Sequence, residues 1–141
     1  MLTFTDQFCG AGGSSQGVRN AGKKVKGLEI KLALNHWKLA IATHQENFKE
    51  TLHDCTDIQA CDPRYYPKTD VLITSPECTN HSLAKGQKQA KQYIDLFTKG
   101  MLDPTAERSR ATMWDVCRFA EVHKYKAIIV ENVVDARKWL M

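Results

Sequence analysis

The sequence predicts a single α/β domain in which helices cover both faces of a parallel sheet. Short apolar segments alternate with segments of helical periodicity along the 141 residues, and this alternation is typical of parallel strands joined by crossover helices. A glycine-rich turn follows the first apolar segment, and polar or reactive residues follow several of the others. Because open parallel sheets bind ligands outside the carboxyl ends of their strands, we expect a binding site where these residues meet.

The first half of the chain predicts a βαβα unit. A short strand that begins at Thr3 runs into a group of glycines, and residues 14–21 then form a helix that ends at Gly22. Residues 28–35 are apolar enough for a second strand, and residues 37–48 space their apolar side chains as a helix with one buried face does.

Three further extended segments follow. Residues 53–58 form a brief third piece, residues 70–74 form a nearly continuous apolar strand of the kind buried on both faces, and residues 126–134 form the last and most apolar strand. We expect this last strand to be an exposed apolar sheet edge, which invites aggregation or pairing with a partner unless something covers it.

The segments between these strands are a loop, a longer loop and a helix. Residues 61–68 contain prolines, and residues 79–110 are polar and basic with breakers at Gly100 and Pro104, so both stretches predict loops. Residues 112–122 place apolar side chains, Met113 among them, on one side of a helix.

Composition leaves few constraints on function. A net charge of +4 permits a nucleic-acid partner without demanding one. Five cysteines form no paired CxxC spacing, which argues against a disulfide framework and a zinc site. No apolar run approaches the roughly 20 residues of a membrane span, and no secretion signal begins the chain. We therefore expect a cytoplasmic protein with no metal and no membrane partner.

The glycine turn after the first strand predicts a cradle for a nucleotide-like cofactor. Glycines at 10, 12 and 13 permit positive φ and bring bare backbone close to a ligand, while Ser14 or Ser15 can cap the next helix. A plain tight turn would show the same glycines, so the turn alone does not decide the function.

Two further residues have the chemistry of a catalytic site. Cys78 follows a proline that ends a strand, where a thiolate could act as nucleophile, although an isolated cysteine is usually a small core residue. Glu131 follows the most apolar strand, so partial desolvation could let it carry a proton near neutral pH; the alternative is a surface charge.

Together these segments resemble the motifs of the cytosine-5 DNA methyltransferases, which use S-adenosylmethionine. Residues 8–13, Phe-Cys-Gly-Ala-Gly-Gly, match the family's cofactor loop, and residues 76–82 resemble its catalytic Pro-Cys motif with a serine four residues later. Residues 131–133 match its Glu-Asn-Val motif. The order and spacing agree over residues 3–135.

The resemblance implies a Rossmann-like methyltransferase sheet, truncated after the fifth parallel strand, and a set of site residues. Residues 35–37 fall where the family places a ribose-binding acid and an aromatic that packs on adenine, and residues 57–58 fall where an acid contacts the adenine amino group. The cofactor residues so implied are Phe8, Cys9, Gly10, Ala11, Gly12, Gly13, His36, Trp37, Asp57, Ile58, Ser75 and Met113.

The implied reaction methylates carbon 5 of a cytosine flipped out of double-stranded DNA. Cys78 attacks ring carbon 6, Glu131 holds ring N3, and Asn132 helps to position Glu131. The basic loop closes over DNA, with phosphate contacts from Ser82, Lys85 and Lys88.

Two positions depart from the family's pattern. His36 replaces the ribose-binding acid, and a neutral imidazole can accept only one hydrogen bond from the ribose hydroxyls. Glu77 replaces the proline usual before the catalytic cysteine, and a carboxylate that points toward Cys78 would raise the pKa of its thiol.

The resemblance stops before the family's target-recognition region and the C-terminal segment that completes the cofactor pocket. Residues 1–141 therefore predict a partial catalytic domain that needs a C-terminal complement, in a bacterial or phage restriction-modification setting, and that is inactive alone. The alternative is an inert module that binds S-adenosylmethionine or DNA. A nicotinamide-dependent oxidoreductase fits the opening turn, but it lacks GxGxxG spacing and leaves Cys78 and Glu131 unexplained.

Overall fold

The described residues form a five-stranded, wholly parallel sheet in the order β3-β2-β1-β4-β5, which confirms the predicted α/β class. The computed structural model describes residues 1–77, 104–134 and 136, and of residues 104–111 the backbone alone. The strands are β1 Leu2–Gln7, β2 Leu28–Asn35, β3 Leu52–Cys55, β4 Val71–Thr74 and β5 Ala127–Val130. Their carboxyl ends share one edge of the sheet, and the strand order reverses between β1 and β4.

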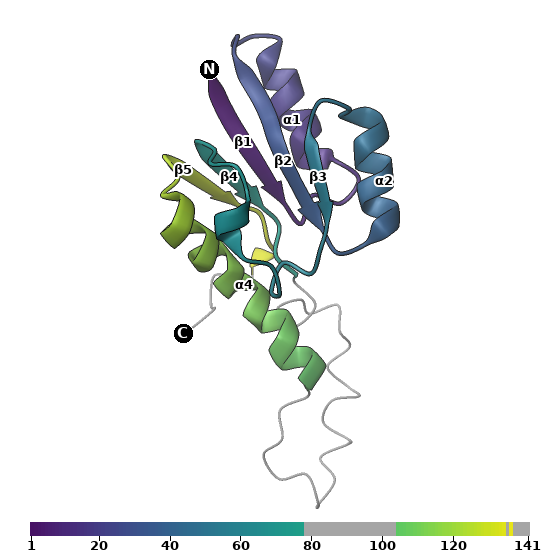
Figure 1. Ribbon diagram of the computed structural model, residues 1–141, viewed down its shortest axis with the longest axis vertical. Helices are drawn as coiled ribbons and strands as arrows, with labels where there is room; N and C mark the ends of the chain where they lie inside the picture. Colours follow the sequence, from purple (N-terminus) through teal and green to yellow (C-terminus); the bar gives the residue numbers. More distant parts are fainter. Residues whose placement is uncertain (78–103, 135, 137–141) are drawn as a thin grey trace, which may run out of the picture.

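Helices lie on both sides of this sheet (Figure 1). Helices α1 (Gly13–Gly22) and α2 (Lys38–Asn47) lie on one side, and α4 (Pro104–His123) lies on the other with the 3-10 turn η1 (Pro63–Tyr65). Among the described residues, none of these helices is long and apolar enough to cross a membrane.

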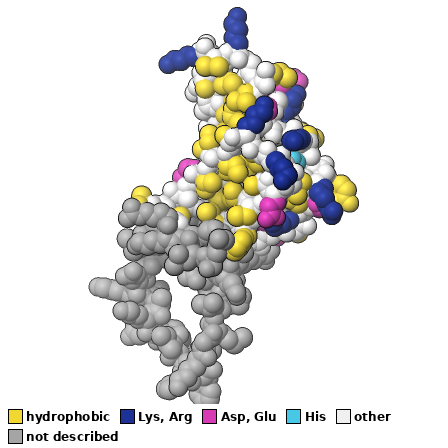
Figure 2. All heavy atoms as spheres, turned by 90° about the vertical axis from the view of Figure 1, so that its left-hand side faces the viewer, with side chains coloured by type: hydrophobic (Ala, Val, Ile, Leu, Met, Phe, Trp, Pro, Cys, Tyr) yellow, Lys and Arg dark blue, Asp and Glu magenta, His cyan; other side chains and the backbone are white. Residues whose placement is uncertain are grey.

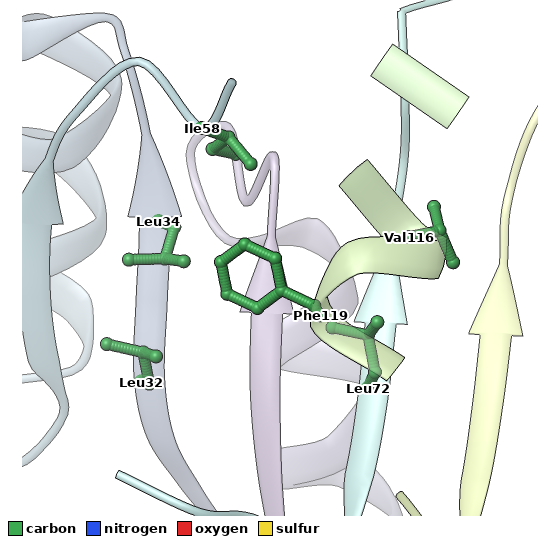
Figure 3. Packing of buried hydrophobic residues seen from close by; sticks show 6 residues of the cluster. All are labelled: Leu32, Leu34, Ile58, Leu72, Val116 and Phe119. Atoms are coloured by element: carbon green, nitrogen blue, oxygen red, sulfur yellow. The ribbon is translucent and has the colours of Figure 1, made fainter. Parts of the chain in front are cut away.

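The side of the sheet that meets α4 holds the larger core. Phe119 is fully buried and points from α4 between Leu34 of β2 and Leu72 of β4 (Figure 3). Leu32, Ile58 and Val116 complete this cluster. A buried cluster of this kind fixes the distance of α4, and of the loop containing Ile58, from the carboxyl edge of the sheet.

A β-bulge in β2 places residues of this strand in the hydrophobic clusters on both sides of the sheet. The register of β1 with β2 shifts between Phe4 and Thr5, because Phe4 pairs with Ile30 and Thr5 with Leu32. Lys31 is therefore the extra residue of a β-bulge, which reverses the inward and outward alternation. Ile30 packs on the α1 side with Phe4, whereas Leu32 packs on the α4 side.

The start of α4 corrects one sequence expectation. Residues 104–110 were predicted as part of the long loop, but they form the first two turns of α4. Pro104 was treated as a breaker, yet proline fits the first turn of a helix, where its missing N–H has no intrahelical partner to lose. The rest of that predicted loop, residues 79–103, lies outside the described residues.

Strand β5 is the exposed apolar edge that the sequence predicts, although it spans only residues 127–130. Ile128, Ile129 and Val130 are 40%, 53% and 42% exposed. Figure 2 looks at the molecule from this side and shows hydrophobic side chains gathered across it. An apolar edge of this kind is a surface for a further strand or helix.

Candidate active site

The glycine turn leaves β1 beside the point where the strand order reverses. Phe8, Gly10 and Gly12 all have positive φ, at 58°, 52° and 101°. The Cys9 N–H donates to the carbonyl of Leu34 at 3.1 Å, which ties the turn to the end of β2. Helix α1 begins directly after the turn, so the N–H groups of its first turn face the same edge of the sheet.

The two sides of this turn differ in the space around them. A Cβ added at Gly10 or Gly13 would meet nothing within 4 Å, whereas a Cβ at Gly12 would lie 2.6 Å from the Phe48 ring. One side of the turn is therefore packed on α2, and the other presents bare backbone to open space. The open side leaves room for a ligand against the backbone, as the predicted cofactor cradle requires.

Gly12→Ala should lower the free energy of unfolding by about 2 kcal/mol, because Gly12 combines a left-handed conformation with a steric clash. Phe48 cannot yield easily, since its ring lies between the Arg19 guanidinium at 4.0 Å and the His44 ring at 4.5 Å. Urea denaturation measures the change. Gly17→Ala is the control: Gly17 lies inside α1 with open space at its Cβ, so alanine should stabilise the protein by about 0.5–1 kcal/mol. Equal effects at both positions would contradict this account.

The β2–α2 junction lies next to the turn. Asn35 ends β2 and is buried; its Oδ1 accepts from the Trp37 N–H at 2.9 Å, and its carbonyl accepts from the Thr56 N–H at 3.0 Å. His36 and Trp37 are exposed, Trp37 at 61%. Asn35 therefore holds the junction, while the predicted ribose and adenine residues remain accessible beside it.

Cys9 is a buried member of the glycine turn and not a reactive thiol. Burial, with a smaller contribution from the nearby Asp6 carboxylate, raises the pKa of its thiol to about 12. The thiol is therefore protonated at neutral pH.

An arginine on α4 holds the loop that follows β3. Arg118 Nη1 donates to the carbonyls of Ile58 and Gln59 at 3.3 and 3.0 Å and to Asp115 Oδ1 at 2.6 Å. Its Nη2 donates to the carbonyl of Cys61 at 2.6 Å. One side chain thus fixes three successive parts of the loop that carries the predicted adenine contacts.

The carboxylate paired with Arg118 belongs to Asp115, which is buried. Burial raises the pKa of Asp115 to about 6, Arg118 opposes that shift, and the Asp57 carboxylate adds to it. Asp57 is thus close enough to Asp115 for their charges to interact. Its Oδ1 accepts from the Gln59 N–H at 3.1 Å, which turns the loop.

The ends of β4 and β5 meet on the other side of the turn. The Ser75 N–H donates to the carbonyl of Gln7 at 3.2 Å, and the Glu131 N–H donates to the carbonyl of Thr74 at 2.9 Å. Asn132 Nδ2 donates to the carbonyl of Pro76 at 3.1 Å. The Glu-Asn-Val segment therefore holds the peptide unit two residues before Cys78.

Met113 and Glu131 complete the placement of the predicted residues. Met113 lies beside the side-chain amide of Asn132, with its Sδ 4.0 Å from Nδ2. Glu131 is exposed, whereas the sequence predicts partial desolvation, because the described residues leave β5 uncovered. Cys78, Ser82, Lys85 and Lys88 lie outside the described residues.

A groove of about 430 Å³ lies elsewhere, between the end of α1 and residues 48–51. None of the residues predicted for the site lines it. The groove is therefore separate from the predicted site.

Sequence reasoning missed Arg118, Asp115 and the polar residues behind the glycine turn. One signal was present: Thr5, Asp6 and Gln7 are consecutive polar residues at the end of a strand predicted to be buried. Buried polar side chains need partners, so this run indicates a polar network under the turn.

The family follows from comparison with known proteins. A model of the family described as C-5 cytosine-specific DNA methylase matches residues 2–138. The chain belongs to this family. The match covers the glycine turn, the Pro-Glu-Cys segment and the Glu-Asn-Val segment together, and it confirms the resemblance seen in the motifs.

Two curated relatives of this methylase chain come from Herpetosiphon aurantiacus. The type II methyltransferase M.HgiDI is 34% identical over 135 residues, which cover 94% of this chain and 37% of the relative. M.HgiGI is 33% identical over 82 residues, 56% of this chain and 61% of the relative. The chain thus spans between about a third and three fifths of the length of these relatives.

Solved structures show the same fold. A protein assigned as a DNA modification methyltransferase of an E. coli prophage superposes with a TM-score of 0.67 at 21% identity, over 98% of this chain and 34% of that one. The Entamoeba histolytica methyltransferase EhMeth gives a TM-score of 0.62 at 16% identity, over 99% and 40%. At these identities the likeness concerns the fold of the methylase chain alone.

Proposed function

We propose that this chain carries the catalytic residues of a DNA cytosine-5 methyltransferase that uses S-adenosylmethionine. The observation that supports this most directly is the hydrogen bond from Asn132 to the carbonyl of Pro76 at 3.1 Å. It joins the Glu-Asn-Val segment to the Pro-Glu-Cys segment at the edge of the sheet that also carries the glycine turn. Family membership supports the reaction class, and this contact joins the two segments that are proposed to be catalytic.

The residues present fit S-adenosylmethionine. Gly10 and Gly13 face open space beside the first turn of α1, where backbone N–H groups suit the methionine carboxylate. Phe8 packs against the core cluster that contains Ile58, so an apolar wall adjoins the Asp57 carboxylate proposed for the adenine amino group. Cys9, Ala11, His36, Trp37, Ser75 and Met113 are proposed to complete the pocket. Bound S-adenosylmethionine would supply the methyl group.

The chain's own residues would activate the cytosine. The Cys78 thiolate adds to ring carbon 6, and the Glu131 carboxyl holds ring N3 so that negative charge can develop in the ring. Asn132 holds the backbone that leads to Cys78. Loss of the carbon-5 proton then expels the thiolate and restores the double bond. Ser82, Lys85 and Lys88 are proposed to contact phosphates of double-stranded DNA.

A further polypeptide segment is proposed to cover β5. The edge is apolar and exposed, and Glu131 beside it is exposed as well. We propose that this complement, on the same or another chain, buries β5, closes the cofactor pocket and reads the DNA sequence. We also propose that the 141-residue chain alone does not methylate DNA, and that it works in the cytoplasm.

Trapping the covalent adduct tests the catalytic proposal. The chain is mixed with the part of M.HgiDI that extends beyond the matched region, S-adenosylmethionine, and a pool of duplexes with 5-fluorocytosine in varied sequence contexts. The fluorine cannot leave as the proton does, so the adduct should accumulate and shift the protein in a denaturing gel. Cys78→Ala should abolish the shift.

Cys55→Ala is the matched control, because Cys55 is an exposed free cysteine at the end of β3. It should leave the adduct intact. An adduct that survives Cys78→Ala would overturn the role of Cys78. Cofactor or DNA binding without any adduct would favour the inert binding module. Methylation by the isolated chain would overturn the need for a complement.

A further inference from the structure

A continuous chain of buried polar side chains lies behind the glycine turn. Ser15 donates to Asp6 Oδ2 through its N–H at 3.1 Å and its hydroxyl at 2.6 Å. His44 Nε2 lies 3.0 Å from Ser15 Oγ, and His44 Nδ1 lies 2.7 Å from Nε2 of His53. Asp6, Ser15 and His44 are at most 1% exposed. The chain joins β1, α1, α2 and β3.

The carboxylate at one end of this chain sets the direction of its first hydrogen bonds. The Ser15 hydroxyl donates to the Asp6 carboxylate, so its oxygen must accept from His44 Nε2–H. The contact between His44 Nδ1 and His53 Nε2 continues the chain to β3, and its donor depends on the tautomers of the two rings. Burial, and secondly the neighbouring His44, lower the pKa of His53.

Each of the elements that these hydrogen-bonded side chains join carries or adjoins a segment proposed to bind the cofactor. Asp6 and Ser15 flank the glycine turn, α2 begins directly after Trp37, and β3 runs toward Asp57. His44 also touches the turn itself, because a Cβ added at Gly12 would lie 3.1 Å from its Cδ2. Its ring therefore contacts α1 and β3 and lies close to the glycine turn, three segments that are proposed to line one pocket.

A purely structural role would be better served by apolar side chains. Burying a carboxylate, a hydroxyl and an imidazole costs desolvation, and Asp6 Oδ1 is buried with no hydrogen-bond partner in the described structure. Unlike apolar packing, a hydrogen bond fixes both the distance and the relative orientation of the two groups that it joins. The polar chain is therefore suited to setting the relative positions of the elements that it joins.

We propose that His44 is a positioning residue of the cofactor pocket: through Ser15 and His53 it holds the first turn of α1, the last turn of α2 and the strand β3 in fixed relative positions. The relation to the cofactor rests on the proposed function, whereas the positioning itself does not.

Hydrogen exchange separates positioning from general stability. His44→Leu keeps the volume and removes both hydrogen bonds, and His44→Gln keeps a donor amide at the reach of Nε2. Thr51→Val is the matched control, because Thr51 is also buried nearby, yet its hydroxyl bonds only to the carbonyl of Ile30 at 3.0 Å. Amide exchange is followed by mass spectrometry in the chain without cofactor.

His44→Leu should speed exchange about tenfold at the hydrogen-bonded amides of Gly12 and Ser15 and at the last turn of α2, with β1 and β4 unchanged, and His44→Gln should restore most of the protection. Thr51→Val should not produce this pattern. Uniform acceleration throughout the sheet, or the same local pattern in Thr51→Val, would overturn the proposal.

Calorimetric titration with S-adenosylhomocysteine gives the second readout. His44→Leu should weaken its binding about tenfold, and His44→Gln less than about threefold. Absence of binding by the unmodified chain, with or without the complement, would contradict the proposed function, while the exchange pattern would still decide the role of His44. Unchanged affinity in His44→Leu would overturn its importance for the cofactor.

Discussion

Phe119→Ala should lower the free energy of unfolding by about 4 kcal/mol, because the ring is fully buried and fills the space between α4 and the sheet. Its neighbours come from α4, β2 and β4, so no single element can move in to close the resulting cavity. The ring also stacks on Tyr66 and His123, with centroids 6.0 and 5.9 Å away. Urea denaturation followed by far-UV circular dichroism measures the loss.

Val122→Ala is the control on the same helix. Val122 is 43% exposed, so its substitution should change the unfolding free energy by less than about 0.5 kcal/mol. A loss below about 2 kcal/mol for Phe119→Ala would mean that α4 is not held to the sheet by this ring. That result would also remove the basis for α4 positioning the loop after β3.

The sequence was sufficient to predict the sheet because its signals are local. Strand β2 occupies residues 28–35 as predicted, since a run of apolar residues between a glycine and the next helix leaves little choice. The bulge at Lys31 could not be predicted, because it depends on which faces α1 and α4 cover. The length of α4 was underestimated, since Pro104 has opposite meanings inside a helix and in its first turn.

The candidate site was predictable as a set of segments and not as a set of contacts. Residues after strand ends are recognisable in sequence because parallel strands bring their carboxyl ends to one edge. Asn132 bonding to Pro76, or Arg118 reaching three carbonyls, requires the three-dimensional arrangement of elements 56 to 60 residues apart. The partners of Asp6 were likewise invisible, since Ser15 and His44 look like ordinary helix residues.

These contacts share one feature: side chains on a helix, at a strand end or just after a strand hold backbone groups of the loops. Asn35 holds the β2–α2 junction, Asn132 holds the Pro76 peptide, and Arg118 holds the loop after β3. Rigid elements and the residues next to them thereby determine the position of loops that carry the proposed chemistry. Substituting the holding residue should therefore disturb a loop without removing any residue that touches a ligand.

Arg118→Met should lower the free energy of unfolding by about 3 kcal/mol at pH 7.5. Methionine keeps much of the stem but leaves three carbonyls without their donor and Asp115 without its countercharge. Breaking a buried ion pair costs roughly 3–5 kcal/mol, and the low end applies because the guanidinium is 37% exposed while Asp115 is 3% exposed. Urea denaturation measures the loss, and hydrogen exchange should increase at residues 57–61 before other loops.

The pH dependence of this loss identifies its electrostatic part. Asp115 has a folded pKa of about 6, above its ordinary value of 3.8, so the folded state binds its proton more tightly than the unfolded state. Its contribution to stability is therefore full below about pH 4 and is lost as the pH rises through 6. Without Arg118 the pKa of Asp115 in the folded state rises further, so this loss extends to higher pH.

The stability lost in Arg118→Met should therefore be smaller at pH 5, where only the carbonyl hydrogen bonds are missing. Asp115→Asn in the same background should remove the pH dependence. An equal deficit at pH 5 and 7.5 would show that Arg118 acts on the loop carbonyls alone.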